Sequence, residues 1–473
     1  MTAAAARIAP PAALAALSLA AGATLAAGAS RFGAAAPLIV LVLPLAPLLA
    51  LAVFAYPPLA VLTVFATFPI GSLVVPGLPP WLQPVETAVL AMATLVVLRR
   101  LATGRTPLRW SGRLWWAVGL VAATLVALPS AVDHSLALKQ IASLLGGLVF
   151  ACVVLTVCRS VNDVRLVVGG LVVVAAGLAV QALVGLDALR ASAGGGVVEG
   201  RLRGVFAHPN ELGSLCAISS LLAVGLAFGS LTRRGRALSA LALVPLLAGL
   251  TFSLSRGAWI GLALGTLVLL VALREARRTA FVLAVPLVVA AAAFGAFAPD
   301  NPQVQVIGER VRTLAAPTSN PYDSRPAIWR EALREIRDDP LTGQGPGGFP
   351  VASARSGSEA STVYAEHAHN IWLTWGAEVG LPSVLLIVGF IGALAFAGRA
   401  SGSTRREGHR RDRAVTAGIG AALVSMLGHG LVNYSLRNSV LSLTLWGLVG
   451  ALLAARERRA GPRTGPSGRR GAA

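Results

Sequence analysis

Apolar residues fall in blocks of about 15 to 25 along most of the chain, and no other feature limits the fold as strongly. A helix of that length crosses the roughly 30 Å hydrocarbon layer of a bilayer. Because a bilayer offers the backbone no hydrogen-bond partners, each block must form a helix that satisfies its own N–H and C=O groups. Apolar residues make up 55% of the chain and charged residues 13%. The sequence therefore predicts an all-α, polytopic integral membrane helix bundle.

Fourteen blocks are candidate spans, so we expect about 12–14 transmembrane helices. Residues 1–30 also fit a cleaved signal peptide, because Arg7 precedes an apolar stretch that ends in small residues. Three parts are expected: N-terminal helices in 1–200, a membrane domain in 201–455, and a disordered basic tail in 456–473. The candidate spans lie near 11–29, 36–55, 58–75, 84–99, 114–131, 140–158, 164–185, 209–229, 237–254, 257–273, 279–298, 381–398, 414–434 and 438–455.

Arginine clusters lie in short connections between the apolar blocks, as is typical of cytoplasmic loops. We therefore place these clusters and both termini on the cytoplasmic side of a plasma membrane. The same positions argue against a nucleic-acid partner, which the formal net charge of +20 would otherwise suggest. The clusters fall at 99–113, 230–236, 274–278, 399–413 and 456–470, and alternation then places 186–208, 254–257, 299–369 and 434–437 outside.

The segment 299–369 is the longest connection and is predicted to be one external loop with short amphipathic helices. Its stretch "SRPAIWREALREIRDDP" predicts a helix on the membrane surface, capped by Ser324 and ended by Asp339-Pro340. The next stretch, "LTGQGPGGFP", predicts a turn-forming loop that moves. The apolar face of the helix is expected to hold Ile328, Trp329, Ala332, Leu333 and Ile336.

Ionisable residues at the edge of a membrane span are costly unless they pair, face a wet cavity or serve function. Arg256 is the clearest, because it lies in a tight external connection where arginine is disfavoured. An interfacial anchor is its alternative interpretation, and an ordinary loop charge is the alternative for Arg201 and Arg203. The other such residues are His208, Glu211, Arg325, His367, His369, Glu378, His429, Asn433 and Arg437.

His367 and His369 are two residues apart, so on a helix they would point to nearly opposite sides. Only one is then expected to face a site, and a solvated loop pair is the alternative. His429 and Asn433 share a helix face and predict a hydrogen-bonded packing pair. Glu378 is interpreted as a structural partner.

Five further residues have structural interpretations. Trp372 and Trp375 suit an interfacial aromatic belt. Cys152, Cys158 and Cys216 lie in or at the ends of apolar blocks without metal-ligand spacing, so we expect small core residues and no disulfide framework.

External arginines together with one or two histidines suit one kind of chemistry. The guanidinium fork binds phosphate oxygens in two-pronged fashion. Histidine accepts a proton from a hydroxyl near neutral pH. No metal or cofactor motif is found in the sequence. The set favours transfer from a diphosphate-linked donor to a hydroxyl acceptor.

Four stretches resemble, in order and in separation, the recurrent stretches of the O-antigen ligase and O-antigen polymerase superfamily. They are "RLRGVFAHPNELG", "SLSRGAW", "SRPAIWREALREIRDDPLTGQGPGGF" and "HAHNIWLTWGAEVGLPS", within about residues 200 to 385. The resemblance implies a bacterial plasma-membrane glycosyltransferase without metal or cofactor. Its donor would be a polyprenyl-diphosphate-linked glycan, and its acceptor a hydroxyl of a glycan, lipid or protein at the external face.

The resemblance also implies roles for individual residues. Arg201 and Arg256 would bind the donor diphosphate. His369, followed by Asn370 as in the ligase His-Asn pair, would be the general base, which selects it over His367. The implied substrate-binding residues are Arg203, Arg325, His367 and Asn370.

Several alternatives stay open. The ligase form of the fourth stretch ends in glycine, threonine or tyrosine where this chain has Ser383. A polymerase, whose acceptor is another lipid-linked glycan, is therefore the first alternative, and an oligosaccharyltransferase is a variant. A lipid-linked glycan transporter or flippase would line both halves of the membrane with charge, whereas here the notable polar residues gather on one side. A structural scaffold leaves Arg256 and the histidines without a role.

Overall fold

A computed structural model describes residues 46–71, 79, 82–184, 197–198, 201–273, 277, 324–362, 366–396 and 407–457. These residues are mostly helical, with one short two-stranded hairpin, which confirms the predicted all-α class. The candidate spans near 11–29 and 279–298, residues 299–323 of the long connection and nearly all of the 456–473 tail lie outside the described residues.

Each candidate span that falls on described residues contains a helix. The first part holds α3 (Ala46–Ala55), α4 (Leu59–Ala66), η4 (Phe68–Ile70), α5 (Pro84–Ala102), η5 (Gly112–Leu114), α6 (Trp115–Val126), η6 (Leu128–Ser130), α7 (His134–Val157) and α8 (Val161–Val184). The strands β1 (Val197–Val198) and β2 (Arg201–Leu202) pair antiparallel ahead of α10 (Pro209–Gly229), α11 (Arg233–Ser253) and α12 (Arg256–Ala272). The last part holds α15 (Arg325–Asp338), α16 (Phe349–Arg355), η8 (Glu359–Thr362), α17 (Ile371–Val379), α18 (Leu381–Phe396), α19 (Glu407–Gly430), η9 (Ser435–Arg437) and α20 (Ser439–Glu457).

Within the described residues, α7, α8, α10, α11 and α20 are long and apolar enough to cross a membrane. Polar caps fix where some of them begin. Asp133 Oδ1 accepts the backbone N–H groups of Ser135 and Leu136 at 2.8 and 3.0 Å, and Thr232 Oγ1 accepts that of Gly235 at 3.0 Å. Such caps satisfy N–H groups that the first helical turn leaves without partners.

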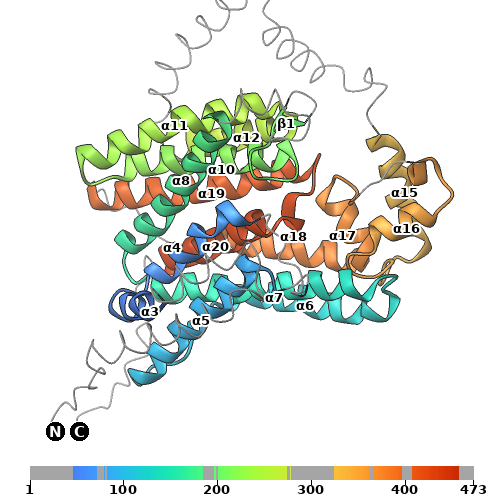
Figure 1. Ribbon diagram of the computed structural model, residues 1–473, viewed down its shortest axis with the longest axis horizontal. Helices are drawn as coiled ribbons and strands as arrows, with labels where there is room; N and C mark the ends of the chain where they lie inside the picture. The colour runs from blue at the N-terminus through green and yellow to red at the C-terminus, as the bar shows by residue number, and fades with distance from the viewer. Residues whose placement is uncertain are drawn as a thin grey trace, which may run out of the picture.

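The helices form two layers that run in roughly the same direction (Figure 1). One layer consists of α10, α11, α12 and α19, and the other of α6, α7, α18 and α20. The first layer packs through small residues: a β-carbon on Gly225 of α10 would lie 2.8 Å from the Cα of Gly418 on α19. Backbones approach this closely in membrane bundles because dispersion contacts must replace the missing hydrophobic drive.

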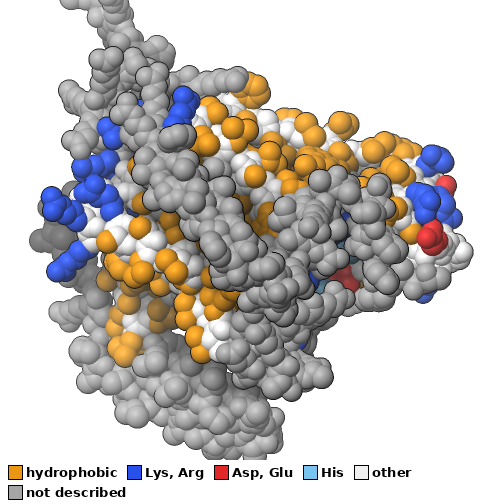
Figure 2. Space-filling model, turned by 90° about the horizontal axis from the view of Figure 1, so that it is seen from above, with side chains coloured by type: hydrophobic (Ala, Val, Ile, Leu, Met, Phe, Trp, Pro, Cys, Tyr) orange, Lys and Arg blue, Asp and Glu red, His pale blue; other side chains and the backbone are white. Residues whose placement is uncertain are grey.

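The two ends of the bundle differ in charge. At one end, Arg109 pairs with Glu457 at 3.0 Å and Arg165 pairs with Asp412 at 2.7 Å, so that connections predicted to be cytoplasmic lie together. The other end carries α15, α16 and α17 (Figure 1). Figure 2 shows apolar side chains along the middle of one face, with both acidic and basic ones at the α15 end and basic ones at the opposite end.

Helix α15 has the predicted position but a different buried face. Ser324 occupies the N-cap position without a side-chain hydrogen bond. The predicted face is wrong for Leu333, which is 51% exposed, because α15 packs on α17 and η8. The buried residues are Ala327, Ile328, Glu331, Ala332 and Glu335.

Two other expectations concerned the core. Cys152, Cys158 and Cys216 are buried, as predicted. Trp375 is only 4% exposed and packs in a cluster that includes Tyr434, so the belt interpretation is wrong for this residue. The reason is that α17 is inserted against the bundle and turns this side chain inward.

Candidate functional site

Arg201 is fixed between the start of α10 and the end of α11. Its Nε donates to the Ser253 carbonyl oxygen at 3.0 Å, and its Nη2 donates to Asn210 Oδ1 at 2.6 Å. It enters this position from the short hairpin, where it pairs with Val198. Because Ser253 lies three residues before Arg256, these contacts put Arg201 beside the α11–α12 connection.

Arg256 is the first residue of α12 and lies at a sharp corner. The preceding Leu254 has a left-handed φ of 50°, which turns the chain. Ser255 then caps the helix by accepting the Ala258 N–H at 3.4 Å. The connection is as tight as the sequence predicted, and the arginine side chain is half-buried there.

The corner at Arg256 packs against the end of α19. A β-carbon on Gly257 would lie 2.8 Å from His429 Cδ2 and 2.7 Å from Val432 Cγ2, so this approach requires glycine. Arg325, the first residue of α15, lies close enough to His429 to act on it electrostatically. His429 therefore adjoins the start of α12, where Arg256 lies, and is within electrostatic range of Arg325.

His367 and His369 lie in a bend ahead of α17 rather than on a helix. The φ of His369 is 50°, a left-handed conformation that is uncommon outside glycine and that clusters at functional sites. Its backbone N–H donates to His367 Nδ1 at 3.1 Å. The two rings meet edge to face with centroids 4.4 Å apart. The expectation that they point to opposite sides is wrong, because it assumed helical geometry.

His367 is a rigid support for His369. Burial, followed by the nearby His369, Arg437 and His208, holds the pKa of His367 well below its ordinary value, so the ring is neutral at neutral pH. Since Nδ1 accepts the His369 N–H, the ring proton is on Nε2. This ring also packs edge to face on Tyr434, with centroids 5.5 Å apart.

Asn433 joins His369 to His429. His369 Nδ1 and Asn433 Oδ1 are 3.1 Å apart, and Asn433 Nδ2 and His429 Nε2 are 3.4 Å apart. In this orientation the amide oxygen accepts the Nδ1–H of His369, and the amide nitrogen donates to a neutral His429. His369 then keeps the lone pair on Nε2, which a general base needs. The predicted His429–Asn433 pair is confirmed and extended to a third residue.

Asn370 holds the histidine loop in place. Its Oδ1 accepts two backbone N–H groups in the first turn of α17, at 2.9 and 3.1 Å. Its Nδ2 donates to the Leu431 carbonyl oxygen at 2.9 Å. On the other side of the loop, Trp329 Nε1 donates to the Ala368 carbonyl oxygen at 2.9 Å. These contacts make Asn370 an orienting residue for the neighbouring His369.

Arg203 and His208 lie on the stretch between β2 and α10. Arg203 Nη1 donates to the Ala207 carbonyl oxygen at 3.4 Å, within its own loop. His208 Nε2 lies 3.9 Å from Glu366 Oε2. Because Glu366 directly precedes the histidine pair, this stretch reaches the loop that carries His369.

Glu378 is fully buried and forms an ion pair with Arg437, in agreement with the structural role predicted for it. The Phe349 N–H donates to the same carboxylate oxygen at 3.4 Å. The glycine-rich turn before Phe349 is packed: a β-carbon on Gly347 would lie 2.9 Å from the Leu136 carbonyl oxygen. The turn is therefore anchored, which does not support the expected movement.

Ser383 closes the junction between α17 and α18. Its hydroxyl donates to the carbonyl oxygens of Gly380 at 2.7 Å and Trp375 at 3.1 Å. A threonine hydroxyl makes bonds of the same kind. The departure from the ligase pattern at this position therefore preserves the local hydrogen bonding.

Glu335 on α15 is a buried acid near Glu378. It is 3% exposed, and neither carboxyl oxygen has a hydrogen-bond partner among the described residues. Burial, followed by the neighbouring Glu331 and Glu378, raises the pKa of Glu335 to about 9. The carboxyl group is therefore protonated at neutral pH in the folded protein.

Glu335→Gln should raise the midpoint of thermal unfolding by a few degrees at pH 8 and much less at pH 5. In the unfolded chain this carboxyl loses its proton above an ordinary pKa of roughly 4.3, whereas in the folded chain it keeps the proton up to about pH 9. The free energy of unfolding therefore falls as pH rises between these two values. Glutamine is neutral throughout. Melting followed by circular dichroism in detergent measures the shift, with exposed Asp338→Asn as control. An equal shift at both pH values would contradict the assignment.

The structure brings most of the predicted site residues to one end of the bundle. Arg203 and Asn370 differ in role: Arg203 donates to the Ala207 carbonyl oxygen of its own loop, and Asn370 bonds backbone groups of α17 and Leu431. Asn433 was not predicted as part of the site. In the described part of the chain, no three His, Cys, Asp or Glu residues lie together as metal ligands. The residues that gather are Arg201, Arg256, Arg325, His367 and His369, with His429 and Asn433 between them.

Residues 241–388 match the family model described as O-antigen ligase. The match runs from within α11 into α18 and includes Arg256, Arg325 and the histidine pair. It ends before Asn433. A comparison with curated proteins finds no match.

Proposed function

Since this chain belongs to the O-antigen ligase superfamily through residues 241–388, we propose that it transfers a glycan from a polyprenyl diphosphate carrier to a hydroxyl acceptor. The superfamily consists of membrane glycosyltransferases, and the spanning helices agree with that setting. The observation that carries the proposal is the network from His369 through Asn433 to His429, which adjoins the start of α12 at Arg256 and is within electrostatic range of Arg325.

The reaction needs one base and one group of cations. The acceptor oxygen attacks the anomeric carbon of the donor glycan and its proton passes to His369 Nε2, while the bond from that carbon to the diphosphate oxygen breaks. Polyprenyl diphosphate leaves with the bonding electron pair. Arg256 and Arg201 bind its phosphate oxygens, and Arg325 and Arg203 assist. His367 and Asn370 flank the substrate and hold the base in position.

The site is proposed to face the outside of a bacterial plasma membrane, with both termini in the cytoplasm. The support is the grouping of arginine-rich connections at the opposite end, where Arg109 pairs with Glu457 and Arg165 with Asp412. His134→Cys and Arg234→Cys, each in a chain whose three native cysteines are buried, test this sidedness by labelling with a membrane-impermeant reagent. Only position 134 should react in intact cells.

Transfer by the purified protein tests the function. The protein is incubated in chelator with a polyprenyl-diphosphate glycan and a panel of hydroxyl acceptors. Formation of a glycosidic product together with stoichiometric polyprenyl diphosphate supports the proposal. Donor binding without turnover on every acceptor would instead support a lipid-linked glycan transporter.

Asn433→Asp should shift the acid limb of the pH–rate profile upward by about one unit, with little rate lost at high pH. A carboxylate 3.1 Å from His369 Nδ1 favours the protonated imidazolium, so the basic form appears only at higher pH. Asn433→Ala should lower the rate about tenfold across the profile, because the base loses its orienting contact. An unchanged profile in the aspartate variant would remove Asn433 from the mechanism.

A further inference from the structure

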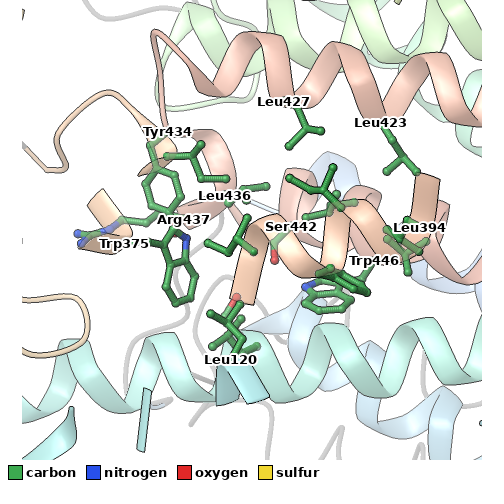
Figure 3. A pocket seen from close by; sticks show the side chains of 18 of the residues that line it. Leu120, Trp375, Leu394, Leu423, Leu427, Tyr434, Leu436, Arg437, Ser442 and Trp446 are labelled. Atoms are coloured by element: carbon green, nitrogen blue, oxygen red, sulfur yellow. The ribbon is translucent and has the colours of Figure 1, made fainter. Parts of the chain in front are cut away.

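A cavity of about 400 Å³ lies between the two helical layers. Helix α18 packs mainly on α6 and α17, which leaves space between it and the neighbouring α19 and α20. Figure 3 shows the labelled lining side chains spread from Tyr434, Arg437 and Trp375 at one end to Leu394 and Trp446 at the other. The cavity is therefore elongated and follows the direction of the helices.

Away from Tyr434 and Arg437 the cavity is lined mostly by apolar side chains. Its walls include Leu120 of α6, Leu423 and Leu427 of α19, Leu394 of α18 and Trp446 of α20. Such walls exclude a sugar, whose hydroxyls would lose their hydrogen bonds to water. A hydrocarbon chain has no hydrogen bonds to lose there. The helices that line the cavity are among those predicted to cross a bilayer.

Several charged groups lie at the end nearest the candidate site, whereas Arg456, which donates to the Leu394 carbonyl oxygen, lies at the other end. Lys139, the chain's single lysine, lines the cavity and is exposed, three residues after Leu136, which touches the glycine-rich turn. Arg437 lines the same cavity, and its pairing with Glu378 fixes the guanidinium in place. Glu86, also in the wall, accepts a hydrogen bond from Ser439. Lysine is usually enriched in cytoplasmic loops, so Lys139 on the side predicted to be external is unusual.

The end of the cavity at Tyr434 adjoins the histidines. Tyr434, which lines the cavity, contacts the His367 ring, and Ile371 lines it two residues after His369. A separate set of contacts leads to Arg256: its neighbour Gly257 packs on His429, which Asn433 links to His369. His369 is therefore connected both to the cavity end that holds Arg437 and to the start of α12.

We propose that the cavity seats the hydrocarbon chain of a second anionic lipid, the acceptor, whose phosphate lies at Lys139 and Arg437. The inference rests on the proposed function and deepens it. The acceptor hydroxyl then belongs to a lipid-phosphate-linked glycan, which presents it to His369 while the donor diphosphate is held at Arg256. Two lipid-linked substrates on either side of one base describe a polymerase-type reaction.

Gly420 offers a clean way to fill the cavity. It lines the cavity, and a β-carbon there would meet nothing within 4 Å, so Gly420→Leu adds volume without a clash at its base. Gly392 on α18 has equally open surroundings and is not among the lining residues, so Gly392→Leu is the matched control. Both changes also raise helix propensity.

The test measures KM separately for donor and acceptor, with one glycan offered free or on polyprenyl phosphate. Gly420→Leu and Lys139→Gln should raise KM for the lipid-linked acceptor about tenfold and leave KM for the donor unchanged, whereas Lys139→Arg and Gly392→Leu behave as the native chain. Equal use of the free glycan, or a raised KM for the donor alone, would overturn the proposal.

Direct binding separates this proposal from the proposed function. A fluorescent polyprenyl phosphate should bind the purified native protein and the Gly392→Leu variant, and bind Gly420→Leu about tenfold more weakly. Equal displacement of the probe by phosphatidylglycerol would mean a structural lipid site and overturn the inference. If no acceptor supports turnover, the proposed function fails. The binding difference between the two variants still tests whether the cavity binds the lipid.

Discussion

His369→Ala should lower the rate of glycan transfer by about a hundredfold or more, the usual loss when a positioned general base is removed. The imidazole is held by an unusual backbone conformation and by the contact of its Nδ1 with Asn433, so the substitution removes a base that is fixed in position. Initial rates of polyprenyl diphosphate release, at saturating donor, measure the effect. The loss should appear in kcat with little change in the donor KM, because the base does not hold the donor.

Two other histidines give this experiment its controls. His134→Ala changes an exposed residue at the start of α7 and should leave the rate unchanged. His367→Ala removes the acceptor of the His369 N–H and should cost about tenfold through misplacement of the base. A larger loss in His367→Ala than in His369→Ala would reverse the assignment of the two residues.

The helices were predictable because their signals are local. Apolar blocks of spanning length mark these elements in the sequence itself. The starts of α7 and α11, which Asp133 and Thr232 cap, lie several residues before the spans predicted at 140–158 and 237–254. The corner at Arg256 was equally visible, since two apolar blocks leave almost no connection between them. Long-range packing was not needed for either inference.

The orientation of the histidines was not predictable, because it depends on one residue with positive φ. A single left-handed residue at His369 folds the backbone so that two rings expected on opposite sides touch. The buried face of α15 was missed for a related reason. Polarity patterns assign glutamates to water, whereas Glu331 and Glu335 are buried against neighbouring elements.

Asn433 shows where sequence reasoning about the site ends. Its spacing of four from His429 indicated a shared helix face, which the structure confirms. Its contact with His369 joins residues 64 positions apart, and nothing in the local pattern points to it. The link depends on α17 meeting the end of α19, which is a matter of tertiary packing.

Arg256→Ala should lower kcat by about a hundredfold, because negative charge grows on the departing diphosphate as its bond to the sugar breaks. Arg256→Lys should recover only part of this, about tenfold, since an ammonium keeps the charge but not the two-pronged geometry. Release of polyprenyl diphosphate in single-turnover experiments measures the chemical step.

Arg234→Ala at the opposite, arginine-rich end is the matched control and should have no effect on transfer. The comparison between lysine and alanine at position 256 is the decisive one. Arg256 lies at a half-buried corner where Leu254 and Ser255 fix the backbone, so a headgroup anchor there would tolerate lysine fully. Full activity in Arg256→Lys, or a loss confined to protein stability, would therefore assign Arg256 to anchoring and leave Arg201 and Arg325 to neutralise the leaving group.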